Sequence, residues 1–457
     1  MTRKARTTRI AAGLIAATTG TTMAAVAALA APAHAAHPAK VAPRPAVTGH
    51  VQAVSRVAPL STSDCVAQIG IHCYSPLQYR NAYDLNPMYA KGITGAGRTI
   101  VIVDSFGSPT IQHDLEAFDA QWGLPDTIVQ IVQAGTIPPF DPTDGTRVGW
   151  AQETTLDVEY AHAIAPGAHI VLVETPVAET EGVTGFPEMM NAEKDLIDHG
   201  VGDVITQSFG ATENTFPGFD SGDFSSLLKL RYAFKDAALH GVTVLASSGD
   251  DGATNATLDG SGVYPFPVNS WPSSDPLVTS IGGTQLVLDN AGTRTSPDVV
   301  WNDGFGAGGG GLSHVFSRPL FQTGVRALVG DHRGTPDISM SAAVDGGCWV
   351  YYTFVNPTSP WHIFGGTSEA SPIFSGIVAM ADQVAHHRLG NINTALYVLG
   401  FLSRLPHSPV PTGLVDVTSG DNSFAGVTGF PAGPGYDLSS GWGTIDAATF
   451  VPALAHT

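Results

Sequence analysis

Ser368 stands in a Gly-Gly-Thr-Ser stretch, residues 365–368, which is followed by a run of apolar and small residues to Met380. The two glycines permit a sharp turn, Thr367 is the predicted N-cap, and the apolar run is typical of a buried helix. Ser368 is then expected at a helix N-terminus. Free N–H groups and the helix dipole favour the negative charge that develops there during acyl transfer. The alternative is an ordinary Ser/Thr-rich cap of a core helix.

A serine nucleophile needs a base, and the usual base is histidine. Asp104 ends a predicted strand, and a strand-end Asp together with a Gly-Thr-Ser helix start resembles the arrangement in subtilisins. The segment that should supply the histidine is absent, and the sequence around His113 does not match it. We therefore expect no Asp-His-Ser triad.

Glu153 and Asp157 are four residues apart in a predicted helix, so their carboxyl groups lie on one face and can share a proton. The pKa of one member of such a pair rises, and the pair can act as a base that also holds a proton. The alternative is a solvated acidic helix face. The flanking residues argue against it, because they are apolar: Leu156, Val158, Ala161, Ala163 and Ile164.

Asp250 is a third carboxylate, after the predicted strand at residues 242–245 and within Gly-Asp-Asp-Gly at residues 249–252. Taken alone this is an ordinary strand-to-loop turn. A protonated Asp at such a point could instead donate a hydrogen bond to an oxyanion, which requires low pH or a raised pKa.

Strands and helices alternate through most of the chain. Four β-branched runs predict strands at residues 98–104, 169–173, 203–206 and 242–245, and residues 224–240 predict a helix that stops at Gly241. This alternation indicates an α/β fold with a parallel sheet sandwiched between helices in a single catalytic domain. Functional groups are then expected at the carboxyl ends of the strands.

Residues 1–35 combine a basic start, a small-apolar stretch and Ala33-His34-Ala35, which predicts a secretory signal peptide. Residues 36–73 are interpreted as a linker or short propeptide, and residues 74–457 as the catalytic domain. We expect a secreted, extracellular monomer that does not associate with a membrane after signal cleavage. The formal charge of -19 makes nucleic acid or an anionic membrane an unfavourable partner.

The three cysteines are Cys65, Cys73 and Cys348. Cys65 and Cys73 form the obvious local pair in an exported protein, which leaves Cys348 free and buried; a bridge between Cys73 and Cys348 is the alternative. Neither the cysteine spacing nor any His-Glu-x-x-His sequence indicates a zinc site.

Taken together, the motifs occur in an order that resembles the sedolisin family, the serine-carboxyl peptidases with a subtilisin-like fold. The supporting segments are residues 153–168, 208–213, 249–252, 272–284, 301–313, 333–337 and 365–372. The resemblance implies Ser368 as nucleophile, Glu153 as general base and Asp157 as its orienting group. It also implies Asp250 as oxyanion donor, beside the backbone N–H of Ser368. A glutamate base, with an ordinary pKa of about 4.3, suits acid pH.

The resemblance also implies one structural Ca²⁺ ion in the C-terminal loop, whose oxygen ligands suit a hard cation. The matching ligands are the carboxylates of Asp416 and Asp437 and the carbonyl groups of Val417, Gly433 and Gly435. The alternative is an Asp- and Gly-rich surface turn.

The leading hypothesis is an acid-active endopeptidase that acts on proteins or peptides. A tripeptidyl aminopeptidase of the same family and an inactive secreted binding protein are the alternatives. Two departures from the family stand out: its members usually carry a long folded prodomain, and Phe209 stands where they commonly have Trp. Asp104, Asp114 and Asp337 are interpreted as structural residues.

Overall fold

The computed structural model describes residues 51–55, 58–405 and 411–457. The predicted signal peptide lies outside the described residues. No described helix is long and apolar enough to cross a membrane.

The central element is an eight-stranded sheet in the order β11-β10-β8-β6-β3-β5-β4, with β14 paired to β10. All neighbouring strands are parallel except β10 and β11. The strands are β3 (Thr99–Ser105), β4 (Gln130–Gln133), β5 (His169–Thr175), β6 (Val204–Gln207), β8 (Thr243–Ser247), β10 (Thr279–Gln285), β11 (Val299–Val300) and β14 (Ile338–Ser341). The four predicted strands are confirmed as β3, β5, β6 and β8.

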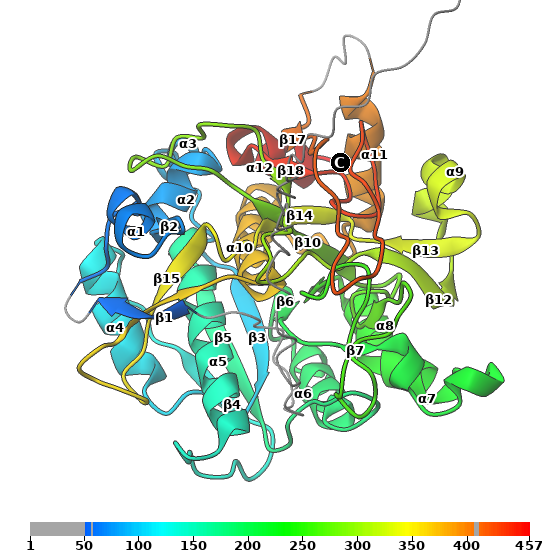
Figure 1. Ribbon diagram of the computed structural model, residues 1–457, viewed down its shortest axis with the longest axis horizontal. Coiled ribbons are helices and arrows are strands. Elements are labelled where there is room, and N and C mark those ends of the chain that lie inside the picture. The colour runs from blue at the N-terminus through cyan, green and yellow to red at the C-terminus, as the bar shows by residue number, and fades with distance from the viewer. Residues whose placement is uncertain (1–50, 56–57, 406–410) are drawn as a thin grey trace, which may run out of the picture. The chain divides into compact units, whose positions relative to one another are not determined.

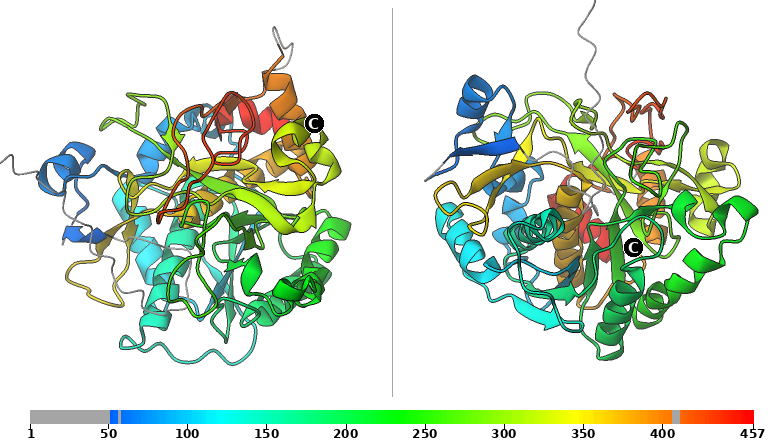
Figure 2. Two further views of the ribbon diagram at one scale, coloured as in Figure 1. Left: turned by 45° about the vertical axis from the view of Figure 1, so that its right-hand side comes forward. Right: turned by 60° about the horizontal axis from the view of Figure 1, so that its bottom comes forward.

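Helices cover both faces of this sheet, as Figures 1 and 2 show. One face carries α5 (Gly145–Ile164) and α10 (Thr367–Ala385), and the other carries α6 (Phe186–Asp198) and α8 (Tyr232–His240). Side chains of β3 alternate accordingly. Ile100 and Ile102 join the hydrophobic core on the α5 side, and Val101 and Val103 join the core on the α6 side. The predicted sandwich is confirmed.

The predicted helix 224–240 is not continuous. It comprises α7 (Ser225–Leu228), a 3-10 turn (Lys229–Arg231) and α8, which ends at Gly241 with a positive φ of 68°. Arg231 lies at the break, and its guanidinium group binds both carboxylate oxygens of Asp275, at 2.5 and 2.8 Å. This tertiary ion pair lies where the helix is interrupted, and the helical periodicity of the sequence did not predict the interruption.

A smaller sheet in the order β1-β16-β15-β2 lies beside the central one. It contains β1 (Val51–Ser55), β2 (Cys73–Tyr74), β15 (Gly347–Tyr351) and β16 (Trp361–Phe364). Thus residues 51–74, mostly within the segment interpreted as linker or short propeptide, contribute two strands and the helix α1 (Thr62–Gln68).

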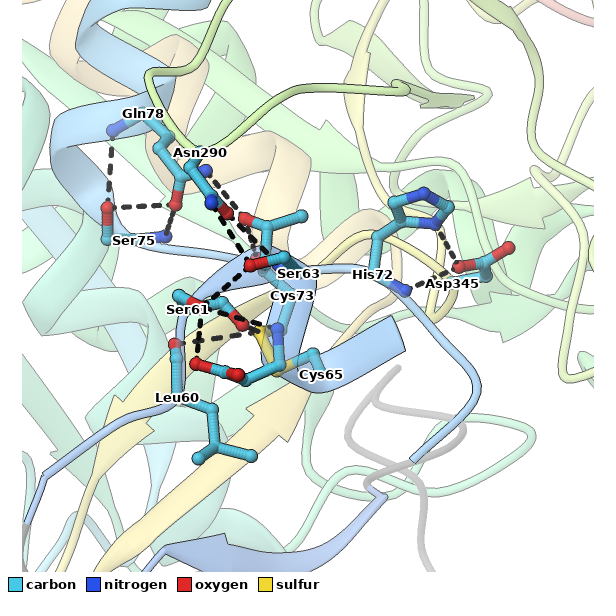
Figure 3. Close-up of a disulfide and its surroundings, with 12 residues drawn as sticks. Leu60, Ser61, Ser63, Cys65, His72, Cys73, Ser75, Gln78, Asn290 and Asp345 are labelled. Carbon is cyan, nitrogen blue, oxygen red and sulfur yellow. Dashed lines mark hydrogen bonds and ion pairs between the residues drawn. A yellow bond between two sulfur atoms is a disulfide. The ribbon is translucent and has the colours of Figure 1, made fainter. Parts of the chain in front are cut away.

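The Cys65–Cys73 disulfide is confirmed and joins α1 to β2, with the two Cα atoms 6.0 Å apart (Figure 3). Cys348 is free and buried, as predicted. Ser63 N–H donates to Asn290 Oδ1 at 3.0 Å, which fixes α1 to a segment more than two hundred residues away.

The remaining elements surround these sheets. They are α2 (Pro76–Ala82), α3 (Asn86–Tyr89), α4 (Ile111–Trp122), α9 (Arg326–Val329), α11 (Asn393–Ser403), α12 (Ala447–Ala455), β7 (Ala211–Thr212), β9 (Ser270–Trp271), β12 (Gly311–Ser317), β13 (His332–Thr335), β17 (Leu414–Val415), β18 (Thr444–Ile445) and 3-10 turns at Glu213–Thr215, Phe219–Ser221 and Leu320–Val325.

Helices α5 and α10 pack directly against each other, and the contact requires a small residue. A Cβ atom on Gly376 would lie 2.7 Å from Ile164 Cγ2, well inside contact distance. The backbone of α10 therefore approaches α5 as closely as a glycine allows.

Replacing Gly376 with Ala is expected to lower the free energy of unfolding by about 1–3 kcal/mol, because overpacking outweighs the better helix propensity of Ala. Urea denaturation measures the change. Gly145→Ala, in α5 with nothing within 4 Å of the new Cβ, is the matched control and should leave stability unchanged or raise it. A stabilised Gly376→Ala variant would contradict the close packing.

Candidate active site

Ser368 is the second residue of α10, and every residue from Thr367 to Asp382 is buried. The N-cap is Gly366, with φ 131° and ψ 158°, so the prediction of Thr367 as N-cap is wrong. The reason is tertiary: the hydroxyl and N–H of Thr367 are both bound to Asp250. The N–H of Ser368 belongs to the first helical turn, where N–H groups have no intrahelical acceptor.

Asp250 binds the start of this helix through its Oδ1. Its Oδ1 accepts hydrogen bonds from Thr367 N at 2.7 Å and from Thr367 Oγ1 at 2.8 Å. Ser247, at the end of β8, donates to the carbonyl of Thr367 at 2.9 Å.

Glu153 and Asp157 lie on α5, and both side chains are fully buried. Ser208, just beyond β6, links this helix to α10. Its hydroxyl lies 2.9 Å from Asp157 Oδ1, to which it donates, and 3.5 Å from the carbonyl oxygen of Ser368. The structure thus brings Asp157, Ser208 and the start of α10 together at the carboxyl end of β6.

Burial dominates the electrostatics of the acidic pair. It raises the pKa of Glu153 well above its ordinary value, and the charges of Asp157 and Asp104 raise it further, while the Ser368 hydroxyl lowers it in part. Burial and the charge of Asp104 likewise raise the pKa of Asp157, against the hydrogen bond from Ser208. The carboxyl groups cannot all be ionised at once, so the site retains protons above the usual range for acids.

Asp104 is the site residue that the sequence analysis placed among the structural ones. It ends β3 as predicted, is fully buried, and raises the pKa of both Glu153 and Asp157 by its charge. Burial raises its own pKa to about 7. The sequence feature that could have identified Asp104 as a site residue is its position at the carboxyl end of a central strand.

The hydroxyl of Ser368 and both carboxylate oxygens of Glu153 make no hydrogen bond of ordinary geometry to any described residue. Ser368 is nevertheless close enough to Glu153 to affect its pKa. A buried hydroxyl beside a carboxyl pair, in the first turn of a helix, has the parts needed for acyl transfer.

The other residues considered as possible catalytic groups lie outside this site. The side chain of His113 is largely exposed and pairs with Asp114 at 3.0 Å, and Asp114 accepts hydrogen bonds from Thr353. Asp337 forms a buried ion pair with Arg333, as expected of a bracing residue.

In the C-terminal loop, Asp416 and Asp437 bind the same glycine-rich turn. Asp416 Oδ2 accepts from Gly435 N at 2.8 Å, and Asp437 Oδ2 accepts from Gly433 N at 3.0 Å. No cluster of three or more His, Cys, Asp or Glu side chains in the described ranges could hold a metal ion. A cation site here would need the main-chain carbonyl groups as well, Val417 among them.

Comparisons with known proteins cover most of the chain. It is 32% identical to kumamolisin from Bacillus sp. (strain MN-32) over 392 residues, which is 83% of this chain and 63% of kumamolisin. It is 31% identical to sedolisin from Pseudomonas sp. (strain 101), covering 82% of this chain and 60% of sedolisin. The solved structure of Pseudomonas sedolisin, a serine-carboxyl proteinase complexed with two molecules of pseudo-iodotyrostatin, superposes with a TM-score of 0.67 at 27% identity, covering 85% of this chain and 99% of that chain.

The chain is a sedolisin homologue. Its homologues are serine-carboxyl peptidases, and tripeptidyl-peptidase 1 from Mus musculus is among them, at 31% identity over 67% of this chain and 51% of the relative. The chain spans about three fifths of the length of kumamolisin and sedolisin. No family model matches it.

Asp104 gives the sedolisin homologue a pH-dependent stability. Its pKa is raised from 3.8 to about 7, so the folded state binds a proton that the unfolded state releases within this window. The free energy of unfolding should therefore fall as pH rises from about 4 to about 7, by up to about 1.4 kcal/mol per pH unit for one proton. Asp104→Asn should flatten this slope in urea denaturation at several pH values. An unchanged slope would contradict the raised pKa.

Proposed function

We propose that the protein is a secreted serine-carboxyl endopeptidase, active at acid pH, that hydrolyses protein or peptide substrates through an acyl-enzyme on Ser368. The observation that carries the proposal is the convergence of α5 and α10, where Ser208 lies between Asp157 and the backbone of Ser368. The similarity to kumamolisin and sedolisin, neither of which is named a tripeptidyl-peptidase, covers more of the chain than the similarity to tripeptidyl-peptidase 1, which favours endopeptidase over tripeptidyl action. Export rests on the predicted signal peptide.

In the proposed mechanism, Glu153 takes the proton of Ser368 Oγ as this oxygen forms a bond with the carbonyl carbon of the substrate. Asp157 orients Glu153 and shares its proton. The carbonyl electrons move to the oxygen, which accepts hydrogen bonds from the N–H of Ser368 and from protonated Asp250. Glu153 returns the proton to the leaving amine as the C–N bond breaks. Water then attacks the ester with Glu153 again as base.

The two roles of the carboxyl groups limit the pH range. The Glu153–Asp157 pair must have lost a proton to act as base, whereas Asp250 must keep its proton to donate. These carboxyl groups are buried near one another. A negative charge on the Glu153–Asp157 pair therefore makes ionisation of the other carboxyl groups less favourable. Activity should therefore decline when the pH is high enough to ionise Asp250.

Ser368→Ala should lower kcat/KM on a mixture of peptides at acid pH by at least about 10³-fold, because it removes the nucleophile. The matched control is Ser375→Ala, on the same helix, whose hydroxyl only donates to the carbonyl of Pro372. Peptides with blocked N-termini should be cleaved as well as free ones. Full activity of Ser368→Ala would overturn the mechanism, and loss of activity on blocked peptides would assign tripeptidyl action instead.

We also propose that the C-terminal loop binds one Ca²⁺ ion. Asp416 and Asp437 supply hard carboxylate oxygens, and both accept hydrogen bonds from the turn at residues 433–435, whose main chain also carries the carbonyl groups of Gly433 and Gly435. This donor set fits calcium. When bound, the ion would hold the loop against the domain, and it takes no part in the acyl-transfer steps.

Calcium binding to the folded state should raise the free energy of unfolding, by about 3 kcal/mol at a free calcium concentration of roughly one hundred times Kd. Thermal unfolding of chelator-treated protein, with and without added calcium, measures this. Asp416→Asn should lose the response. Asp421→Asn, in the same loop with its carboxylate bound to Ser423, is the control and should keep it. Equal responses of both variants would exclude Asp416 as a ligand.

A further inference from the structure

Glu369 directly follows the candidate nucleophile, and the mechanism does not use it. Its side chain is fully buried, and neither carboxyl oxygen makes a hydrogen bond of ordinary geometry to a described residue. It lies among Tyr79 of α2, Ser341 of β14, Cys348 of β15 and Tyr160 of α5, each of which interacts with it or is affected by its charge.

The hydroxyl groups around Glu369 already donate their hydrogen bonds to other acceptors. Tyr79 Oη donates to the carbonyl of Gly346 at 3.1 Å, and Tyr160 Oη donates to the carbonyl of Trp349 at 2.9 Å. Ser341 Oγ donates to Tyr79 Oη at 3.3 Å. These oxygens offer lone pairs, which suit a carboxyl group that carries a proton. To stabilise a carboxylate they would have to give up the bonds they make.

No cation compensates Glu369 among the groups that the structure places around it. The titratable groups that face or influence it are Tyr74, Tyr79, Tyr83, Tyr160 and Cys348, and burial raises the pKa of every one of them. Glu159 on α5 acts on the same cluster as another acid. The guanidinium group of Arg294 lies over the ring of Tyr83 but is paired with Asp298.

A glutamate in the first turn of a helix is usually ionised, because the helix dipole favours a negative charge there. Here burial has the larger effect and raises the pKa of Glu369 to about 8, although Tyr79, Ser341 and Cys348 lower it in part. The carboxyl group is therefore neutral throughout the acid range and becomes charged only in alkali.

We propose that Glu369 is a positioning residue: its neutral carboxyl group allows the first turn of α10, and Ser368 with it, to stay buried in place, and its ionisation in alkali releases that turn. The charge would form beside lone pairs in a site without a compensating cation, and it can reach water only if the start of α10 moves. The role of Ser368 rests on the proposed function, but the movement of the turn does not.

Amide hydrogen exchange of the peptide containing residues 365–371, corrected for the intrinsic rate, tests the proposal between pH 6 and pH 10. The wild-type protein should lose protection in this peptide by more than tenfold above about pH 8, while β3 stays protected. Glu369→Gln keeps the size of the side chain but cannot ionise, so it should retain protection. If this variant does not fold, Glu369→Met, which has similar length and no charge, replaces it.

The matched control is Glu193→Gln, on the opposite face of the sheet. Glu193 is also fully buried, with a pKa raised to about 8, and it binds Gln207. This variant should lose protection at 365–371 as the wild type does. Loss of protection in Glu369→Gln at the same pH, or simultaneous loss in β3, would overturn the proposal. Hydrogen exchange is measured without substrate. An inactive enzyme would therefore contradict the proposed function without contradicting the proposal for Glu369.

Discussion

The burial of acids without compensating cations is the constraint on which the candidate site depends. Glu153, Asp157 and Asp104 are all fully buried between the central sheet and its helices, and no ion pair is formed by any of the three with a described residue. An isolated charge in such a place is so unfavourable that the group keeps its proton instead. The folded state therefore retains protons on these acids, and the Glu153–Asp157 pair can act as the proposed base only after it has lost one of them.

Neutral hydroxyl groups hold this acidic centre in place. Ser208 binds Asp157, Thr367 binds Asp250, and Thr206 pairs with Ser371 at 2.8 Å, which joins β6 to α10. Serine and threonine do not change charge over the pH range in which the carboxyl groups titrate. The bonds that place α5 and α10 against the sheet can thus persist while protons move between the acids.

The sequence predicted the elements whose identity depends on local pattern. β3, β5, β6 and β8 occur where β-branched runs predict them, and the buried helix carrying Glu153 and Asp157 follows from its apolar flanks. What it did not predict depends on contacts between distant segments. The N-cap moved to Gly366 because Thr367 binds Asp250, and the predicted helix at 224–240 is interrupted where Arg231 pairs with Asp275.

Asp104 and Glu369 show the same limit for single residues. A strand-end aspartate and a first-turn glutamate each have an ordinary structural explanation, and only the fold reveals what surrounds them. Asp104 faces two more acids across the end of β3, and Glu369 faces hydroxyl oxygens whose protons are engaged elsewhere. For Asp104 the sequence offers only its position at the end of a predicted strand, and for Glu369 the spacing along the chain carries no signal.

The protein neutralises buried acids elsewhere, so the lack of cations beside Glu153 is not a general property of its core. Arg333 binds Asp337 with both side chains fully buried, and Arg231 binds Asp275 through two hydrogen bonds. Such an arginine beside Glu153 would lower the pKa of the acidic pair and weaken it as a base. Beside Asp250 it would favour the ionised form, which cannot donate to an oxyanion. A serine-carboxyl site therefore requires acids that are buried and left without a cation, and pH-dependent stability follows from that requirement.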